Sequence, residues 1–193
     1  MKKKIILGVL ALLALVCLLS SVYTVEENQY ACTVRFSKII HTTQTPGLHF
    51  KVPFLDSVKY FPKAMMLYDI PPSEVLTSDK QNMTVDNYIL WRVSDPLLFY
   101  QSLGSTVVAE ERLNALTYNT LKTVMGTLSQ ADIINMDDAS ERNEIYAGIA
   151  SSVNALAQNY GIEVVDVKIK RFDLPEANEN AVYARMISER NQI

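Results

Sequence analysis

Apolar residues are concentrated near the N-terminus in one uninterrupted run from Ile5 to Leu19, directly after three consecutive lysines. Extended through residues 20–23, the run approaches the roughly 20 residues that a helix needs to span a bilayer. We therefore expect residues 5–23 to be a transmembrane anchor. Residues 1–4 would be cytoplasmic and the rest extracytoplasmic, because lysines favour the cytoplasmic side. The alternative is a cleaved signal peptide, which the missing small-x-small cleavage site disfavours.

Beyond this run, short segments alternate between apolar and polar residues with the period of two that is typical of strands. In the first of them, Tyr30, Cys32, Val34 and Phe36 would form the buried face and the intervening residues a wet face. Further alternating or apolar segments are residues 48–52, 58–61, 74–77 and 83–93. The last two flank a polar turn and predict an antiparallel hairpin. Its core face would carry Met83, Val85, Ile89, Trp91 and Val93.

Helical periodicity begins after Asp95, where Pro96 suits a first helical position. A later apolar stripe consists of Ile145, Ile149, Val153, Leu156 and Tyr160, and Gly161 would cap its helix. Val165, Val167 and Ile169 then alternate with charged residues as a strand with one wet face. Pro175 would start a last helix, for which no Gly or Pro terminator occurs near Ile193.

These patterns predict an α+β chain in which an N-terminal transmembrane helix precedes a β-rich subdomain and an α+β subdomain. The expected regions are residues 1–4, 5–23, 24–94, 95–174 and 175–193. At 193 residues and 49% hydrophobic content, the chain can bury a sizeable core. A net charge of -3 with scattered basic residues argues against nucleic-acid binding. Cys17 and Cys32 are not expected to pair, because only Cys17 lies in the apolar run.

The sequence contains no recognisable catalytic or metal-binding motif. The sequence has no G-x-S-x-G, H-E-x-x-H or Gly-rich phosphate loop, and its two histidines, His41 and His49, lack neighbours at metal-ligand spacing. Asp166 shares a strand face with Lys168 and is expected to form an ordinary ion pair. We therefore expect neither an enzyme nor a bound metal or cofactor.

The segment PGLHFKVPFL from Pro46 to Leu55 allows two interpretations. Its apolar residues are Leu48, Phe50, Val52, Phe54 and Leu55. Leu48, Phe50 and Val52 could be the core face of a strand. Because the segment follows the anchor closely in sequence, all five residues could instead enter the lipid interface.

Four stretches in order along the chain resemble those of SPFH, or band 7, proteins: the stomatins, prohibitins, flotillins and HflK/C proteins. They are VEENQYACTVRFSK, TPGLHFKVPFLDSVK, VDNYILWRVSDPLLFY and GIEVVDVKIKRFDLP. The bacterial HflC branch is the most similar. One departure is Ser37, which stands where many relatives carry Gly.

The resemblance implies a non-enzymatic scaffold in the bacterial inner membrane, with the SPFH domain on the extracytoplasmic side. Such proteins form hetero-oligomers with an HflK-like paralogue, contact membrane lipids and modulate an FtsH-type membrane protease. A stomatin-like organiser of membrane microdomains, lipids or channels is the alternative. Family members continue through a long coiled-coil region, so residues 175–193 would begin an assembly helix. Its partner-facing stripe would be Val182, Met186 and Ile193.

Overall fold

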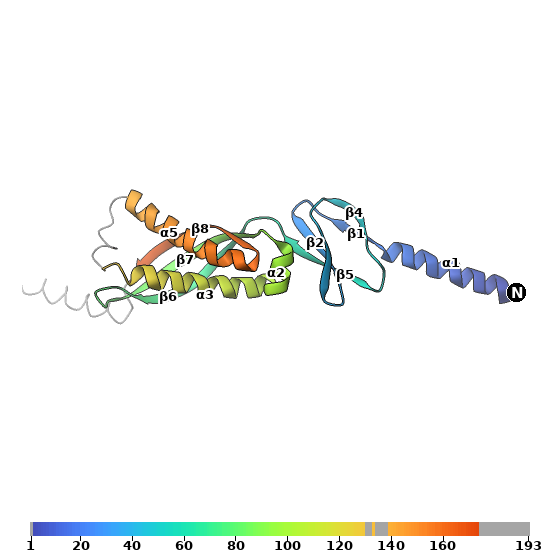
Figure 1. The fold of residues 1–193 in the computed structure, drawn as a ribbon, viewed down its shortest axis with the longest axis horizontal. Coiled ribbons are helices and arrows are strands. Elements are labelled where there is room, and N and C mark those ends of the chain that lie inside the picture. The colour runs from blue at the N-terminus through green and yellow to red at the C-terminus, as the bar shows by residue number, and fades with distance from the viewer. Residues whose placement is uncertain (1, 130–132, 134–138, 174–193) are drawn as a thin grey trace, which may run out of the picture.

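The computed structural model describes residues 2–129, 133 and 139–173 (Figure 1). Its helices are α1 (Lys2–Ser20), α2 (Pro96–Ser102), α3 (Thr106–Met125), α5 (Ala139–Ala157) and the 3-10 helix η1 (Gln158–Tyr160). Its strands are β1 (Val22–Val25), β2 (Gln29–Arg35), β3 (Lys38–Thr43), β4 (Gly47–Phe50), β5 (Asp56–Pro62), β6 (Met66–Leu76), β7 (Asn82–Val93) and β8 (Ile162–Asp173). The predicted assembly stripe of Val182, Met186 and Ile193 lies outside the described residues.

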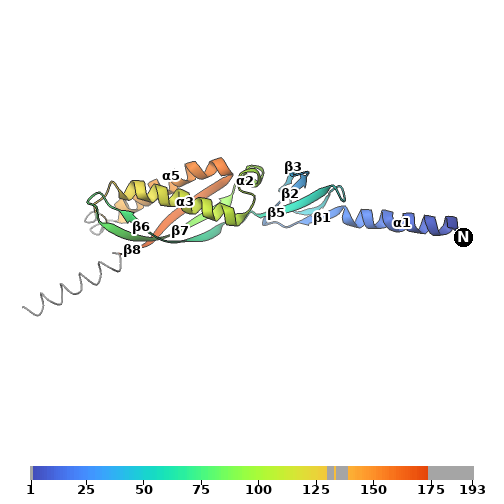
Figure 2. The same ribbon diagram turned by 90° about the horizontal axis from the view of Figure 1, so that it is seen from below.

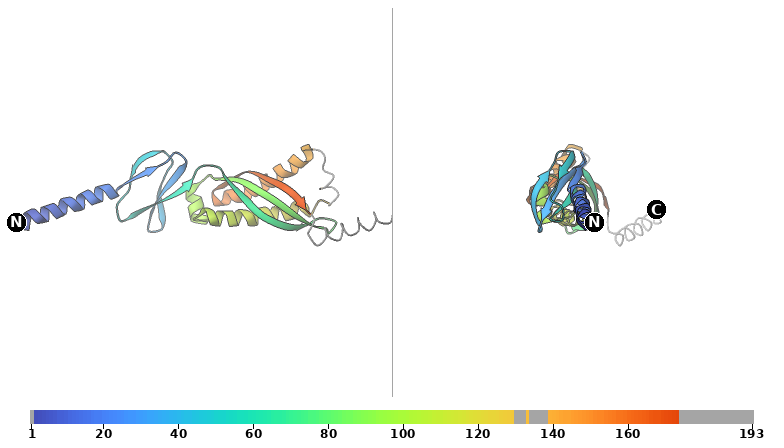
Figure 3. Two further views of the ribbon diagram at one scale, coloured as in Figure 1. Left: turned by 180° about the vertical axis from the view of Figure 1, so that it is seen from behind. Right: turned by 90° about the vertical axis from the view of Figure 1, so that its right-hand side faces the viewer.

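The molecule is elongated, with three parts in a row along its long axis (Figures 1 and 3). Helix α1 projects at one end, strands β1 to β5 form a small β unit in the middle, and the remaining helices and strands form a larger α+β unit beyond it. Within the part of the chain that the structure describes, no helix has both the length and the apolar character required to cross a membrane.

The small β unit, residues 22–63, contains two antiparallel sheets. One pairs β1 with β4, and the other has the order β3-β2-β5. The predicted wet face of β2 is wrong, because Ala31 and Thr33 are buried as well as Cys32. Ala31 packs with Tyr23 and Val25 of β1, so neighbours cover the central strand on both faces.

The larger unit is a three-stranded antiparallel sheet, ordered β6-β7-β8, with α3 and α5 on one of its faces (Figure 2). The predicted hairpin is confirmed as β6 and β7, and all five residues expected on its core face are buried. The sheet joins this hairpin to β8, which lies beyond the boundary expected at residues 94/95. Asn87 lies on the same buried face of β7, although its amide suggested no core role.

Two predicted core positions in this unit are wrong. Leu156 is exposed, because Ala157 continues the buried i, i+4 series of Ile149 and Val153 on α5. Val165 is exposed because a β-bulge interrupts its strand: Leu90 pairs with Asp166 and Trp91 with Val164. Sequence alternation cannot reveal a single inserted residue that reverses the alternation beyond it.

A compact junction at the start of α2 joins the two units. Asp95 caps α2, its carboxylate accepting the backbone N–H groups of Leu97 and Leu98, with Pro96 at the first helical position as predicted. The ring of Phe99 on α2 contacts Trp91 of the large sheet at 6.4 Å and Phe61 of the small β unit at 5.3 Å. Aromatic contacts at these centroid distances stabilise beyond their buried area, so Phe99 couples the two cores.

Candidate functional site

The five apolar residues predicted between Pro46 and Leu55 form an exposed surface, which we call the loop surface. The exposed fractions are 69% for Leu48, 79% for Phe50, 43% for Val52, 85% for Phe54 and 50% for Leu55. The interpretation of Leu48, Phe50 and Val52 as the core face of a strand is therefore wrong. Exposed apolar side chains that cluster on a surface are typical of protein or membrane interaction sites.

The loop surface lies directly at the end of α1. Strand β4 pairs with β1 in a register that sets Phe50 opposite Val22, two residues after the helix ends. The Lys51 backbone N–H donates to the Ser21 carbonyl at 2.7 Å, and the Ser21 hydroxyl donates to the Lys51 carbonyl at 2.6 Å. Figures 1 and 3 show the teal loop between β4 and β5 beside this end of α1. The loop is thus held at a fixed place relative to the helix.

A turn closed by Asp56 shapes the outer part of the loop surface. The Val52 N–H donates to the Asp56 carboxylate at 2.9 Å, and the Asp56 N–H donates to the Val52 carbonyl at 3.0 Å. Arg35 donates two hydrogen bonds to the same carboxylate, at 2.6 and 3.0 Å. The Arg35 hydrogen bond, assisted by the Val52 N–H, holds the pKa of Asp56 below its usual value, although partial burial opposes the shift. The turn is therefore fixed by a charged anchor point on β2.

Phe54, at the apex of this turn, has φ 65. Positive φ is costly for a bulky L-residue. The side chain nevertheless faces solvent with most of its area exposed. Burial against the described part of the chain therefore offsets little of the backbone cost.

The polar residue His49 lies between Leu48 and Phe50 of the loop surface. His49 hydrogen-bonds the Thr45 carbonyl at 2.9 Å through Nε2, and its ring lies 5.7 Å from that of Tyr23. Among the described residues, no three His, Cys, Asp or Glu side chains are grouped so that they could hold a metal ion. Cys17 and Cys32 are both free, which confirms that they do not pair. Asp166 and Lys168 form the predicted ion pair at 3.4 Å. The arrangement supports contact with an apolar phase.

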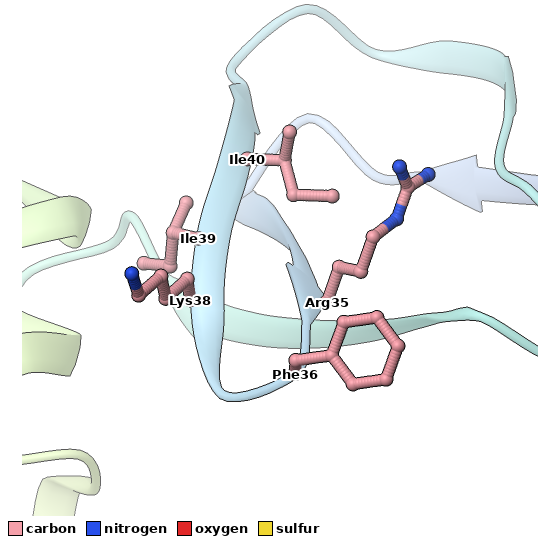
Figure 4. A pocket seen from close by; sticks show the side chains of 5 residues that line it. All are labelled: Arg35, Phe36, Lys38, Ile39 and Ile40. Atoms are coloured by element: carbon pink, nitrogen blue, oxygen red, sulfur yellow. The ribbon is translucent and has the colours of Figure 1, made fainter.

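Sequence reasoning missed one exposed residue, Phe36, which it assigned to the buried face of a strand. Strand β2 ends at Arg35, and Phe36 and Ser37 form a two-residue turn with φ 48 and 64. Phe36 is 82% exposed. It lines a shallow pocket at the hairpin tip together with Arg35, Lys38, Ile39 and Ile40 (Figure 4). The signal in the sequence was the family resemblance, which implies Gly at the position of Ser37, because glycine marks backbone positions of positive φ.

Comparison with known proteins places the chain in a family. Residues 23–193 match the SPFH domain / Band 7 family. The "Modulator of FtsH protease HflC" of Escherichia coli K12 is 29% identical over 236 aligned positions, covering 100% of this chain and 70% of the relative. "Protein HflC" of Buchnera aphidicola subsp. Schizaphis graminum is 31% identical, covering 98% and 67%. "Protein HflC" of Haemophilus influenzae is 30% identical, covering 90% and 61%. The chain therefore belongs to the SPFH domain / Band 7 family, with HflC proteins among its relatives.

Proposed function

We propose that this protein is a non-enzymatic, membrane-anchored scaffold that assembles with an HflK-like paralogue and modulates an FtsH-type membrane protease. The proposal is supported by similarity to a relative named as a modulator of the FtsH protease. The loop surface fits this role, because it is apolar and carries no catalytic group. The observation that carries the membrane part is the position of five exposed apolar side chains at the end of α1.

In this proposal residues 5–23 anchor the chain in the bacterial inner membrane, with residues 1–4 cytoplasmic and the SPFH domain extracytoplasmic. Helix α1 exposes leucines along its length, including Leu18 and Leu19 next to the small β unit. Three lysines precede the apolar run, which favours a cytoplasmic N-terminus. Carbonate extraction and protease protection of the full chain in inverted vesicles test this topology. Release by carbonate, or digestion of the domain from the cytoplasmic side, would contradict it.

The loop surface, in the same proposal, enters the lipid interface beside the anchor. Burying a side chain of the size of Phe or Leu contributes about 1.5–3 kcal/mol. Phe50 and Phe54 together would therefore strengthen bilayer contact by several kcal/mol. In nanodiscs, a fluorophore on Leu55→Cys in a Cys17→Ser background should be quenched more strongly by iodide when the Phe50→Ser/Phe54→Ser substitutions are present. Equal quenching with and without these substitutions would contradict lipid contact. A control is Val107→Ser, which alters an exposed apolar residue on α3.

Partnership with a protease is tested by purification from native membranes. The tagged full chain should recover an HflK-like paralogue and an FtsH-type protease, and the double variant should recover less of both if bilayer contact orients the domain. Recovery of neither protein by the wild-type chain would reject the scaffold proposal. A stomatin-like organiser of lipids or channels would instead cluster in a lipid-dependent way without a protease.

Assembly through the stripe of Val182, Met186 and Ile193 is also part of the proposal. Its four- and seven-residue spacing is typical of a helical interface. Light scattering of a Val182→Ser/Met186→Ser variant should show a smaller particle than the wild-type chain in the presence of the partner. An unchanged particle mass would reject a role for this stripe.

A further inference from the structure

We propose that the turn between β2 and β3 is a second bilayer contact, in which Phe36 enters the interface of an anionic membrane while the net positive charge of the small β unit draws the domain onto it. This inference rests on the proposed membrane attachment and assigns a role to residues outside the loop surface.

Phe36 and Phe54 share an uncommon combination of exposure and backbone strain. They are the two most exposed large hydrophobic side chains among the described residues, at 82% and 85%. Both have positive φ, and the other non-glycine residues of the described chain with positive φ are Ser37 and Lys80. Two-residue hairpin turns of this kind favour Asn or Gly, which adopt positive φ at little cost. With 82% of its side chain exposed, Phe36 gains little from burial in the fold, and we infer that its benefit comes from outside the protein.

The hairpin tip is connected to the loop surface through one ion pair. Arg35, the residue before Phe36, pairs with Asp56 in the β2–β5 register, and Asp56 in turn closes the turn that carries Phe54. Strand β2 ends at Arg35, and its partner β5 starts at Asp56, directly after Leu55. Phe36 therefore lies at the end of the sheet that is next to the loop surface. The two strained phenylalanines therefore belong to the same end of the small β unit.

The two sides of the hairpin have different surroundings (Figure 4). Arg35, Phe36 and Ile40 point to one side and Lys38 and Ile39 to the other. Ile39 packs against the main core, and β3 contacts α2, so that side faces the rest of the protein. The side with Phe36 also exposes Ile40. The apolar side of the tip is thus directed away from the larger unit.

Charge is segregated along the molecule in a way that suits an anionic surface. Residues 22–63 carry five basic and three acidic side chains, whereas residues 64–173 carry eight basic and fifteen acidic ones. Two of the three acidic residues, Glu26 and Glu27, lie before β2, at the end of the strand opposite Phe36. The third, Asp56, is neutralised by Arg35. An anionic bilayer would attract the small β unit and repel the larger one, which holds the elongated domain upright.

The test uses the full chain in nanodiscs with an environment-sensitive fluorophore on Phe36→Cys, in a Cys17→Ser background. Cys32 is buried and stays unlabelled. Matched labels on Phe54→Cys and Val107→Cys report the loop surface and a distant exposed site. In discs containing phosphatidylglycerol, the probe at residue 36 should be blue-shifted and quenched by iodide several-fold less than the probe at residue 107. In discs of phosphatidylcholine alone, this protection should be weaker.

The outcomes separate this inference from the proposed function. Protection at residue 54 without protection at residue 36 would overturn the second contact and leave the anchor and loop surface intact, whereas protection at neither would also remove the lipid role of the loop surface. Equal protection at residue 36 in both lipid compositions would overturn the charge argument. Protection that requires a co-purified protein would assign the tip to a protein partner instead.

A second variant distinguishes function from folding. Phe36→Gly removes the backbone strain, so it should raise the Tm of the chain in detergent while weakening the lipid protection of a probe on Ile40→Cys. Opposite changes in Tm and lipid protection support the proposal. A lower Tm for Phe36→Gly would show that the ring serves the fold and would overturn it.

Discussion

Gly161→Ala is expected to destabilise the fold more than an ordinary surface substitution. Gly161 has φ 72, and a Cβ placed there would lie 2.4 Å from the Asp95 carbonyl oxygen and 2.7 Å from the Phe99 backbone nitrogen. Both contacts are with backbone, which cannot rotate away. The chain must therefore move at the junction where α2 meets the end of η1.

The magnitude follows from the contacts at this junction. A left-handed conformation costs a residue with a Cβ about 1–2 kcal/mol relative to glycine. The Gly161 carbonyl accepts the N–H groups of Ser94 and Asp95 at 3.0 and 3.1 Å. Displacing the chain weakens both bonds, each worth about 1 kcal/mol. The free energy of unfolding should fall by about 3–4 kcal/mol, which lowers the Tm of a chain of this size by about 6–16 °C.

Gly148→Ala provides the matched control, because the same chemical change should have the opposite sign. Gly148 is exposed on α5, and a Cβ there meets nothing within 4 Å. Alanine in a helix interior is more stable than glycine by about 0.5–1 kcal/mol. Thermal unfolding of the full chain in detergent, followed by circular dichroism, measures both variants. A Gly161→Ala variant as stable as the wild type would refute the steric reasoning.

Three further predictions concern single side chains. The Arg35–Asp56 pair should stabilise the fold fully at pH values above the ordinary carboxyl pKa of about 3.9, and this effect should be lost as the pH falls through the lowered pKa of Asp56. In Asp56→Asn, the Tm should therefore fall less steeply as the pH is lowered. An unchanged fall in Tm would contradict this. Thr117→Val should raise the free energy of unfolding by about 1 kcal/mol, because the buried Thr117 hydroxyl has no hydrogen-bond partner among the described residues. A fall in Tm would show that the hydroxyl does have a partner. Burial raises the pKa of the Cys32 thiol, so Cys32 should resist a thiol reagent at pH 8 until the protein unfolds. Rapid labelling of Cys32 in the native chain would contradict its burial.

Predictions from the sequence were most accurate for strands with regular apolar–polar alternation and for helix ends marked by capping residues. The alternation of β7, the Asp95-Pro96 helix start and the left-handed cap at Gly161 all appear as predicted. These features are local, since each depends on neighbouring residues alone. The error at Val165 arises from a β-bulge, which depends on the register between β7 and β8. The error at Leu156 concerns which side of α5 is buried, and that depends on how the helix packs on its neighbours.

Burial differs between two strands that show the same alternation. Residues 48–52 and 83–93 both alternate between apolar and polar types, yet the first exposes its apolar residues and the second buries them. The difference is tertiary, because α3 and α5 cover the face of β7 while β4 belongs to a two-stranded sheet. Sequence pattern therefore identified the members of the loop surface but left its exposure open. Whether an alternating apolar strand face is buried or exposed depends on the tertiary packing around it.

The positive φ values of Phe36 and Phe54 help to recognise an interaction surface, and neither sequence alternation nor hydropathy contains this information. An exposed apolar side chain alone is common on protein surfaces and needs no explanation. An exposed aromatic ring at a backbone position that glycine would occupy at lower energy is different, because both the exposure and the strain oppose its presence in water. Two such residues occur at one end of one small β unit, beside an apolar helix. A surface that takes up both rings would account for both costs at once, and in the function proposed above that surface is the bilayer beside α1.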